Sequence, residues 1–284
     1  MHTINCKGKL LVLDTPVVMG IINTTPDSFY GNSRKETVQS VSETAAQMIG
    51  EGAAILDIGG QSTRPGSIRL TAEQEKERVI PAIDTILQKF PNAIISVDTY
   101  IGEVAYKAVQ AGASVVNDIS SGDMDKDMLA TVADLKVPYI CMHMQGNPGT
   151  MQKNPRYNDV TAEVLDYLAQ KVDTCHRLGI NDIIVDPGFG FGKTIEHNFH
   201  LLRNLSTFKI LNCSVMAGLS RKSTVYKTLG TTPEEALNGT TVLHTIALLN
   251  GADILRVHDV KAASETIMLL QKYKGQNPSK VNKW

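Results

Sequence analysis

The segment AAILDIGGQSTRPGS, residues 53–67, begins with an apolar run suited to a buried strand and then turns polar. Seven other apolar runs, rich in β-branched residues, also end in polar or glycine-rich sequence. They are VVMGIIN (17–23), AIISVD (93–98), SVVNDIS (114–120), PYICMHM (138–144), DIIVDPGFG (182–190), SVMAGLS (214–220) and ADILRVHD (252–259). The eight runs follow one another at about 33 residues on average, the length of a βα unit.

Helical periodicity fills the intervals between these runs. Apolar residues recur at helical spacing in the segments 38–49 and 79–87. Near-continuous apolar strands indicate a parallel sheet that is buried on both faces. Eight such repeats without an intervening linker predict an α/β fold, a single-domain TIM (β/α)8 barrel over residues 1–284, with a doubly wound sheet as the alternative. The polar segment from about 275 to 284 is expected to form a flexible tail.

Composition narrows the class of protein. The chain has 284 residues, of which 42% are hydrophobic and 20% charged, as in a globular protein. Its 28 basic and 29 acidic residues give a net charge of −1, without the basic excess of a nucleic-acid binder. We find no apolar stretch long enough for a signal peptide or a membrane span, and no CxxC pair among the four cysteines. These features predict a cytoplasmic protein with reduced thiols and no membrane or nucleic-acid partner.

Polar residues gather where a barrel places its active site, at the carboxyl ends of the strands. They are Asn23, Gln61 to Arg64, Asp98, Asn117 with Asp118, His143, Asp186, Arg221 to Ser223, and Arg256 with His258. Taken singly, Asp98 could be a helix N-cap and Asn117 a turn former. The loops 23–35 and 59–71 are long and rich in Pro, Gly, Ser and Thr, which favours lids or substrate loops.

Cations from three strand ends indicate an anion site. They are Arg64, Lys222, Arg256 and His258, and such a cluster in a chain without net positive charge predicts binding of a phosphate group. Lys222 and Ser223 are also expected to begin a helix, whose free N–H groups favour anions. The histidines lack a metal-binding spacing, so we expect any metal to be Mg²⁺ that arrives with a phosphate substrate.

The segment PGFGFGKT, residues 187–194, resembles a Walker A loop only at its end. Pro187 stands where that motif requires glycine, and the glycines do not match GxGxxG either. We interpret the loop as a place where backbone approaches a flat ligand closely.

Eight ordered blocks resemble the dihydropteroate synthase family. They are MGIINTTPDSF, DIGGQSTRPGS, SVDT, VNDISS, MHMQGNP, DPGFGFGKT, GLSRKS and RVHDV, and the match runs from about residue 17 to 272. The resemblance implies a TIM barrel, usually a homodimer. It also implies a transferase of folate biosynthesis that joins 6-hydroxymethyl-7,8-dihydropterin diphosphate to p-aminobenzoate, releases pyrophosphate and is inhibited by sulfonamides.

The resemblance also implies a role for individual residues. Asn23 looks like the ligand of Mg²⁺ and the diphosphate, and Thr63 and Arg64 look like residues of the mobile second loop. The pterin pocket would be formed by Asp98, Asn117, Asp186 and Lys222, and the diphosphate site by Arg256 and His258. Ser223 would receive the p-aminobenzoate carboxylate, and the remaining substrate contacts would be Pro65, Met142, Phe189 and Phe191.

The expected mechanism is dissociative. Mg²⁺, Arg64, Arg256 and His258 would draw off pyrophosphate, and Asp98 would help to stabilise the resulting pterin-methylene cation before the amine attacks. Lys222 completes the set of expected catalytic residues. Asp186 would accept paired hydrogen bonds from the aminopyrimidine edge, and Asn117 would donate and accept along it.

Two departures and two alternatives accompany this resemblance. The first loop reads DSFYGNSRKE where the family usually has DSFSDGG, and Gln61 stands where glutamate is usual. One alternative is a pterin-dependent methyltransferase of the same barrel superfamily, although a methyl donor has no diphosphate for these cations to hold. The other is a non-catalytic pterin-binding paralog.

Overall fold

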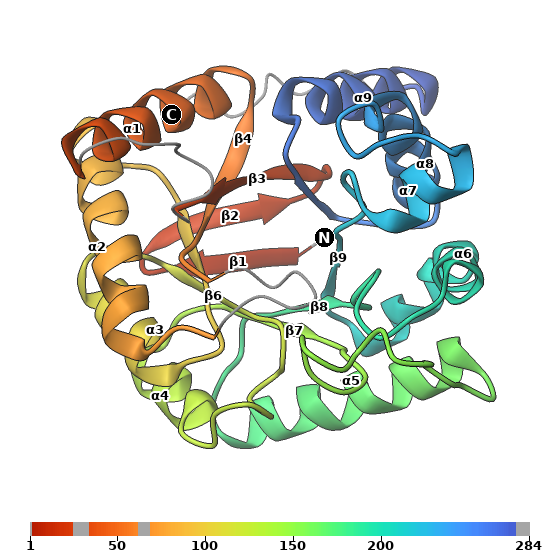
Figure 1. Cartoon of the computed structure of the whole chain (residues 1–284), viewed down its shortest axis with the longest axis horizontal. Helices are drawn as coiled ribbons and strands as arrows, with labels where there is room; N and C mark the ends of the chain where they lie inside the picture. The colour runs from red at the N-terminus through yellow and green to blue at the C-terminus, as the bar shows by residue number, and fades with distance from the viewer. Residues whose placement is uncertain (1, 25–33, 62–68, 277–284) are drawn as a thin grey trace.

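The strands form one closed barrel. The computed structural model describes residues 2–24, 34–61 and 69–276. Eight parallel strands close in the order β10-β3-β4-β5-β6-β7-β8-β9 (Figure 1). Their bounds are β3 Val17–Asn23, β4 Ala53–Gly59, β5 Ile95–Asp98, β6 Val115–Asp118, β7 Tyr139–Met142, β8 Ile183–Asp186, β9 Ser214–Ala217 and β10 Ile254–Val257. The single TIM barrel predicted from the eight runs is confirmed, and the doubly wound sheet is wrong.

Helices surround the barrel, as the periodicity predicts. Their bounds are α1 Arg34–Gly50, α2 Ala72–Lys89, α3 Gly102–Gln110, α4 Met128–Leu135, α5 Val160–Arg177, α6 Ile195–Arg203, α7 Ser223–Leu229, α8 Leu237–Leu249 and α9 Val260–Tyr273, and a 3-10 helix, η2, covers Leu205–Leu211. A large apolar core lies between strands and helices. None of the helices in the described part of the chain combines the length and the apolar character needed to cross a membrane.

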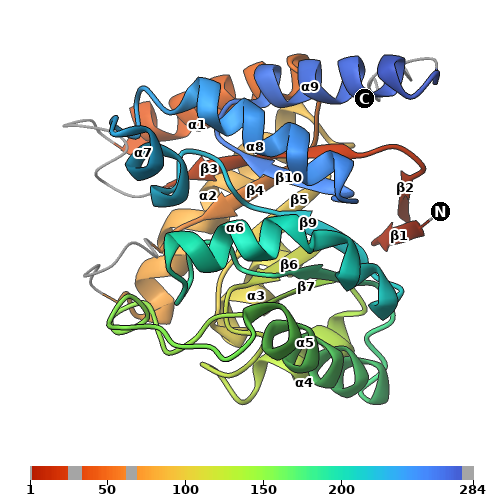
Figure 2. The ribbon, with the colours of Figure 1, turned by 90° about the vertical axis from the view of Figure 1, so that its right-hand side faces the viewer.

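A β-hairpin that the sequence analysis did not foresee covers one end of the barrel. Strands β1 (His2–Cys6) and β2 (Lys9–Leu13) pair antiparallel, joined by Lys7 and Gly8, both at positive φ as a tight hairpin turn requires. One face of the hairpin, including Ile4 and Leu11, packs against the apolar residues inside the barrel. Figure 2 shows the hairpin at the opposite end of the molecule from α7.

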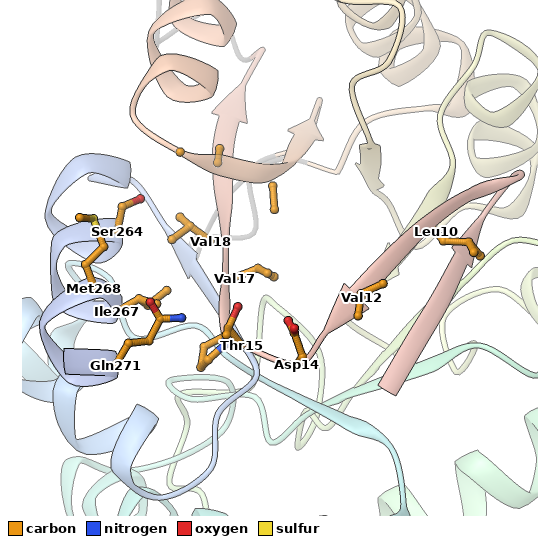
Figure 3. A pocket seen from close by; sticks show the side chains of 14 residues that line it. Leu10, Val12, Asp14, Thr15, Val17, Val18, Ser264, Ile267, Met268 and Gln271 are labelled. Atoms are coloured by element: carbon orange, nitrogen blue, oxygen red, sulfur yellow. The ribbon is translucent and has the colours of Figure 1, made fainter. Parts of the chain in front are cut away.

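A surface pocket lies beside this hairpin. Figure 3 shows its lining, which comes from β2 of the hairpin, the segments 14–18 and 52–54, and helix α9. Because the pocket lies at the amino ends of β3 and β4, it is separate from the mouth formed by the carboxyl ends of the strands.

Candidate active site

The carboxyl ends of neighbouring strands bring the predicted polar residues together. In the ladders Gly59 pairs with Asp98, Asp98 with Asn117, and Met142 with Asp186. Asp98 is the last residue of β5, and Ile101 caps α3, so the reading of Asp98 as a helix N-cap is wrong. Asn117 lies within β6 and not in a turn.

Arg256 is held between two carboxylates. Its Nε donates to Oδ2 of Asp57 at 2.6 Å, and its Nη2 donates to Oδ2 of Asp98 at 2.5 Å. Asn117 Nδ2 donates to the same Asp57 oxygen at 3.1 Å. Asp57 is fully buried, so this guanidinium balances charge that water does not reach. The result is a rigid cation inside the mouth.

Asp98 lies at the centre of this arrangement. Burial raises its pKa above the usual range, Arg256 opposes the rise, and the nearby Asp57 and Asp118 add to it. Gly59 leaves room here, because a Cβ at Gly59 would lie 3.6 Å from Oδ2 of Asp98 and 3.7 Å from Oδ1 of Asn23. The exposed Asn23 amide oxygen and the Asp98 carboxylate therefore both face Gly59.

Lys222 and Asp186 form the second part of the site. Lys222 Nζ donates to the Phe189 carbonyl at 2.5 Å and lies 4.8 Å from the centre of the Phe191 ring. Asp186 Oδ1 accepts from the Gly188 N–H at 2.7 Å. Burial raises the pKa of Asp186, against the charge of Lys222, and burial lowers the pKa of Lys222 to about 8, against the charge of Asp186. The two side chains thus carry opposite charges, and each favours the ionised form of the other.

Gly218 gives the pair its space. A Cβ on Gly218 would lie 3.5 Å from Lys222 Nζ and 3.8 Å from Asp186 Oδ2. Both charged groups therefore face the same glycine, with no side chain from that position between them. A flat polar ring could lie against this surface.

Two adjacent pairs join the loops that follow β9 and β10. Ser220 Oγ lies 3.0 Å from Nδ1 of His258 and accepts from the His258 backbone N–H at 3.2 Å. Arg221, at φ 52°, makes two hydrogen bonds of 2.8 Å to the Asp259 carboxylate. Arg221 is therefore engaged structurally, and Lys222 and Arg256 are the cations left for a ligand at these two strand ends. Burial, together with the charge of Arg256, lowers the pKa of His258 to about 4, so this imidazole is neutral and can serve a ligand as a hydrogen-bond partner.

The other predicted substrate contacts differ in position. The Phe189 side chain is fully buried in the core, so its ring does not reach the mouth, where only its backbone carbonyl takes part. Phe191 and the buried Met142 belong to a small cluster with Tyr100. Ser223 begins α7 and is half-buried. Thr63, Arg64 and Pro65, and most of both long loops, lie outside the described residues.

Nothing in the described ranges forms a group of three or more His, Cys, Asp or Glu side chains suited to a metal ion. A hard cation such as Mg²⁺ needs oxygen ligands and keeps several waters. The exposed Asn23 amide oxygen at the end of β3 fits the role of a single protein ligand in such a set.

Sequence reasoning missed three residues of the site. Asp57 appeared only as part of an apolar strand, Ser220 as the end of one, and Lys193 as part of a false Walker motif. The signal for Asp57 was a charged residue within an otherwise apolar run, since burial of an unpaired carboxylate is costly.

Comparison with known proteins identifies the family. The model of a family described as pterin binding enzyme matches residues 19–258. The dihydropteroate synthase of Escherichia coli K12 is 42% identical over 267 residues, which cover 93% of this chain and 94% of the relative. The chain belongs to the dihydropteroate synthase family.

Solved dihydropteroate synthases share the whole fold. The Xanthomonas albilineans enzyme with 4-aminobenzoic acid matches with a TM-score of 0.88 and 40% identity, covering 96% of this chain and 98% of that one. The enzyme of the same species in complex with 7,8-dihydropteroate matches with a TM-score of 0.87 and 37% identity, and the match covers 96% of this chain and 99% of that one. The Yersinia pestis dihydropteroate synthase in complex with a sulfonamide drug matches with a TM-score of 0.90 and 35% identity, and the match again covers 96% of this chain and 99% of that one.

Proposed function

We propose that this dihydropteroate synthase joins a dihydropterin diphosphate to p-aminobenzoate and releases pyrophosphate. The observation that carries the proposal is Arg256, a cation fixed between Asp57 and Asp98 at the mouth. A guanidinium held in place before the substrate arrives can stabilise developing charge on a leaving group without reorganisation.

The pterin ring is assigned to the Asp186 side of the mouth. Oδ1 of Asp186 accepts a hydrogen bond from the Gly188 N–H, and Oδ2 lies near Gly218. The carboxylate can therefore accept hydrogen bonds from the aminopyrimidine edge of a pterin. Asn117 is buried with its amide group on Asp57, which leaves its carbonyl oxygen as an acceptor. Lys222 donates to the Phe189 carbonyl and can also donate to a ring acceptor.

The diphosphate is assigned to Arg256, His258 and Asn23. When bound, Mg²⁺ would neutralise charge on the diphosphate, with Asn23 as a protein ligand. As pyrophosphate leaves, the fixed Arg256 stabilises the negative charge that develops on it, and the neighbouring Asp98 carboxylate stabilises the electron-poor pterin methylene. The arylamine is neutral at pH 7 and needs no general base before it attacks the methylene. The C–O bond to pyrophosphate breaks, the C–N bond forms, and the nitrogen then loses its extra proton to water or to the departing pyrophosphate.

The p-aminobenzoate is assigned to the start of α7. Ser223 and the backbone N–H groups of the first turn suit its carboxylate, and the half-buried Phe191 suits its ring. We propose that sulfonamides compete at the same place, as the drug complex of the Yersinia pestis relative suggests.

Arg256→Ala tests the assignment of the diphosphate. Wild-type protein with Mg²⁺ should bind dihydropterin diphosphate at least about tenfold more tightly than the pterin alcohol, because charge-assisted hydrogen bonds to phosphate stabilise the complex. In Arg256→Ala this preference should disappear, and the chemical step should slow by orders of magnitude. Equal binding of both pterins by the wild type, measured by calorimetry, would favour the methyltransferase-like alternative.

We also propose a homodimer through the helices that follow β9 and β10. Helices α8 and α9 lie side by side (Figure 1). They and α7 expose large apolar residues, namely Leu229, Leu237, Val242, Ile246, Leu249, Leu269 and Tyr273. Exposed apolar surface of this extent is typical of an interface.

The four free, buried cysteines support a place in the reducing cytoplasm.

A further inference from the structure

The lysine of the false Walker motif is buried behind the pterin pocket. Lys193 lies between β8 and α6 and is only 3% exposed. A Walker lysine reaches out to a phosphate, but this one points back into its own loop. No part of the mechanism above uses it.

Four contacts surround the Lys193 ammonium group. Nζ lies 3.0 Å from the carbonyl oxygens of Gly188 and Phe191, 3.3 Å from that of His143, and 2.9 Å from His143 Nδ1. Burial lowers the pKa of His143 to about 3, and the charge of Lys193 lowers it too, so this imidazole is neutral and its Nδ1 accepts. Lys193 therefore joins His143, which follows β7, to Gly188 and Phe191 of the loop 187–192.

The loop needs such an anchor because it has few side chains of its own. Gly188, Gly190 and Gly192 all have positive φ. A Cβ at Gly188 would lie 2.0 Å from the His143 carbonyl oxygen, and one at Gly192 would lie 2.5 Å from that of Gln145. The backbone thus packs directly against the segment 143–145, and glycine-rich backbone is entropically costly to hold in one conformation.

This loop positions both charged groups of the pterin pocket. The Gly188 N–H donates to Asp186, the Phe189 carbonyl accepts from Lys222, and the Phe191 ring lies against the Lys222 ammonium. A shift of the loop would therefore displace Asp186 and Lys222 together.

We infer that Lys193 is a positioning residue of the pterin pocket, which fixes the loop 187–192 and, through it, Asp186 and Lys222. The inference rests on the proposed function, since it assumes that this pocket binds a pterin. Lys193 also acts by its charge. The cations that face Asp186 are Lys222, Arg256 and Lys193, and all three favour its ionised form. Burial lowers the pKa of Lys193 to about 7, against the charge of Asp186.

Lys193→Met tests the inference, with the exposed Lys126→Met as its matched control. The probe is 6-hydroxymethyl-7,8-dihydropterin, titrated by calorimetry from pH 5 to pH 8. Loss of the anchor should raise Kd at least about tenfold at pH 7. Pterin affinity should fall at low pH, where Asp186 becomes protonated and no longer accepts both hydrogen bonds. Because loss of the Lys193 charge raises the pKa of Asp186, this fall should begin at a higher pH in Lys193→Met. A purely structural role would not move this pH profile.

A milder variant keeps the test valid if Lys193→Met does not fold. Tyr157 Oη donates to the Gly192 carbonyl at 2.8 Å, so Tyr157→Phe removes one bond to the loop and leaves the ammonium in place. It should weaken pterin binding about two- to fivefold. Unchanged pterin affinity in a folded Lys193→Met, or in Tyr157→Phe if the first does not fold, overturns the inference. Failure of the wild type to bind the pterin overturns the proposed function instead.

Discussion

At the scale of single residues, the site depends on charges that the barrel buries in pairs. Arg256 forms ion pairs with Asp57 and Asp98 that hold it in place before a substrate binds. Lys222 and Asp186 act on one another through their charges, each of which favours the ionised form of the other. Removing one member leaves the other buried and uncompensated, so each pair acts as a unit. This explains why an apolar strand, β4, contains a carboxylate at all.

Lys222→Arg tests the charge of this lysine through pH. Burial lowers the pKa of Lys222 to about 8, so the protonated form that donates to the pterin is lost as pH rises through 8. We expect kcat/KM for the pterin substrate to fall above about pH 8 in the wild type, and this alkaline fall to move upward in Lys222→Arg, which stays charged. A pH–rate profile checks this, and an identical alkaline fall in both proteins would remove Lys222 as its cause.

The sequence predicts where several candidate site residues lie in the barrel, but not which side chains they contact. Asp98, Asn117, Asp186 and Arg256 were expected at the mouth because strand ends converge there, and the ladders confirm that convergence. Asp57 and Asp98 share the guanidinium of Arg256 because of the register of β4, β5 and β10 and the rotamers of these side chains. No local sequence pattern predicts either. The burial of Phe189 could not be foreseen for the same reason.

At the scale of elements, periodicity predicts the eight strands and the helices well, because each must bury a face of known period. The hairpin is hard to predict from sequence because the alternation of exposed and buried residues extends over only five residues on each strand. Its inward face contributes to the core inside the barrel, and its outward face lines the pocket in Figure 3.

Leu11→Ala measures what the hairpin contributes to stability. Leu11 is 2% exposed and packs inside the barrel, so truncation should reduce the free energy of unfolding by about 2–5 kcal/mol. Its neighbour Leu10 is 66% exposed, and Leu10→Ala should change stability by less than about 0.5 kcal/mol. Urea denaturation compares them, and equal effects would show that the hairpin does not seal the barrel.

At the scale of the whole molecule, the proposed dimer face lies on the outer helices of the barrel. The mouth lies at the carboxyl ends of the strands, and the exposed apolar residues of the proposed dimer face lie on helices α7 to α9. The proposed assembly would use the outer sides of these helices and would leave the mouth open to substrates.

Val242→Asp tests this assembly. Val242 is 52% exposed on α8, and a carboxylate there should convert the dimer to a monomer in sedimentation experiments. The control, Tyr106→Asp, alters a residue that is 46% exposed on α3, across the barrel from α8 (Figure 1), and the variant should remain a dimer. A wild-type protein that sediments as a monomer at high concentration would contradict the proposal.

The most direct test of the central claim is the product formed from 6-hydroxymethyl-7,8-dihydropterin diphosphate, Mg²⁺ and p-aminobenzoate. The account predicts one pyrophosphate released for each 7,8-dihydropteroate identified by mass spectrometry, and loss of both in Arg256→Ala. Substrate binding by the wild type without any dihydropteroate would contradict it and indicate a pterin-binding protein that has lost catalysis.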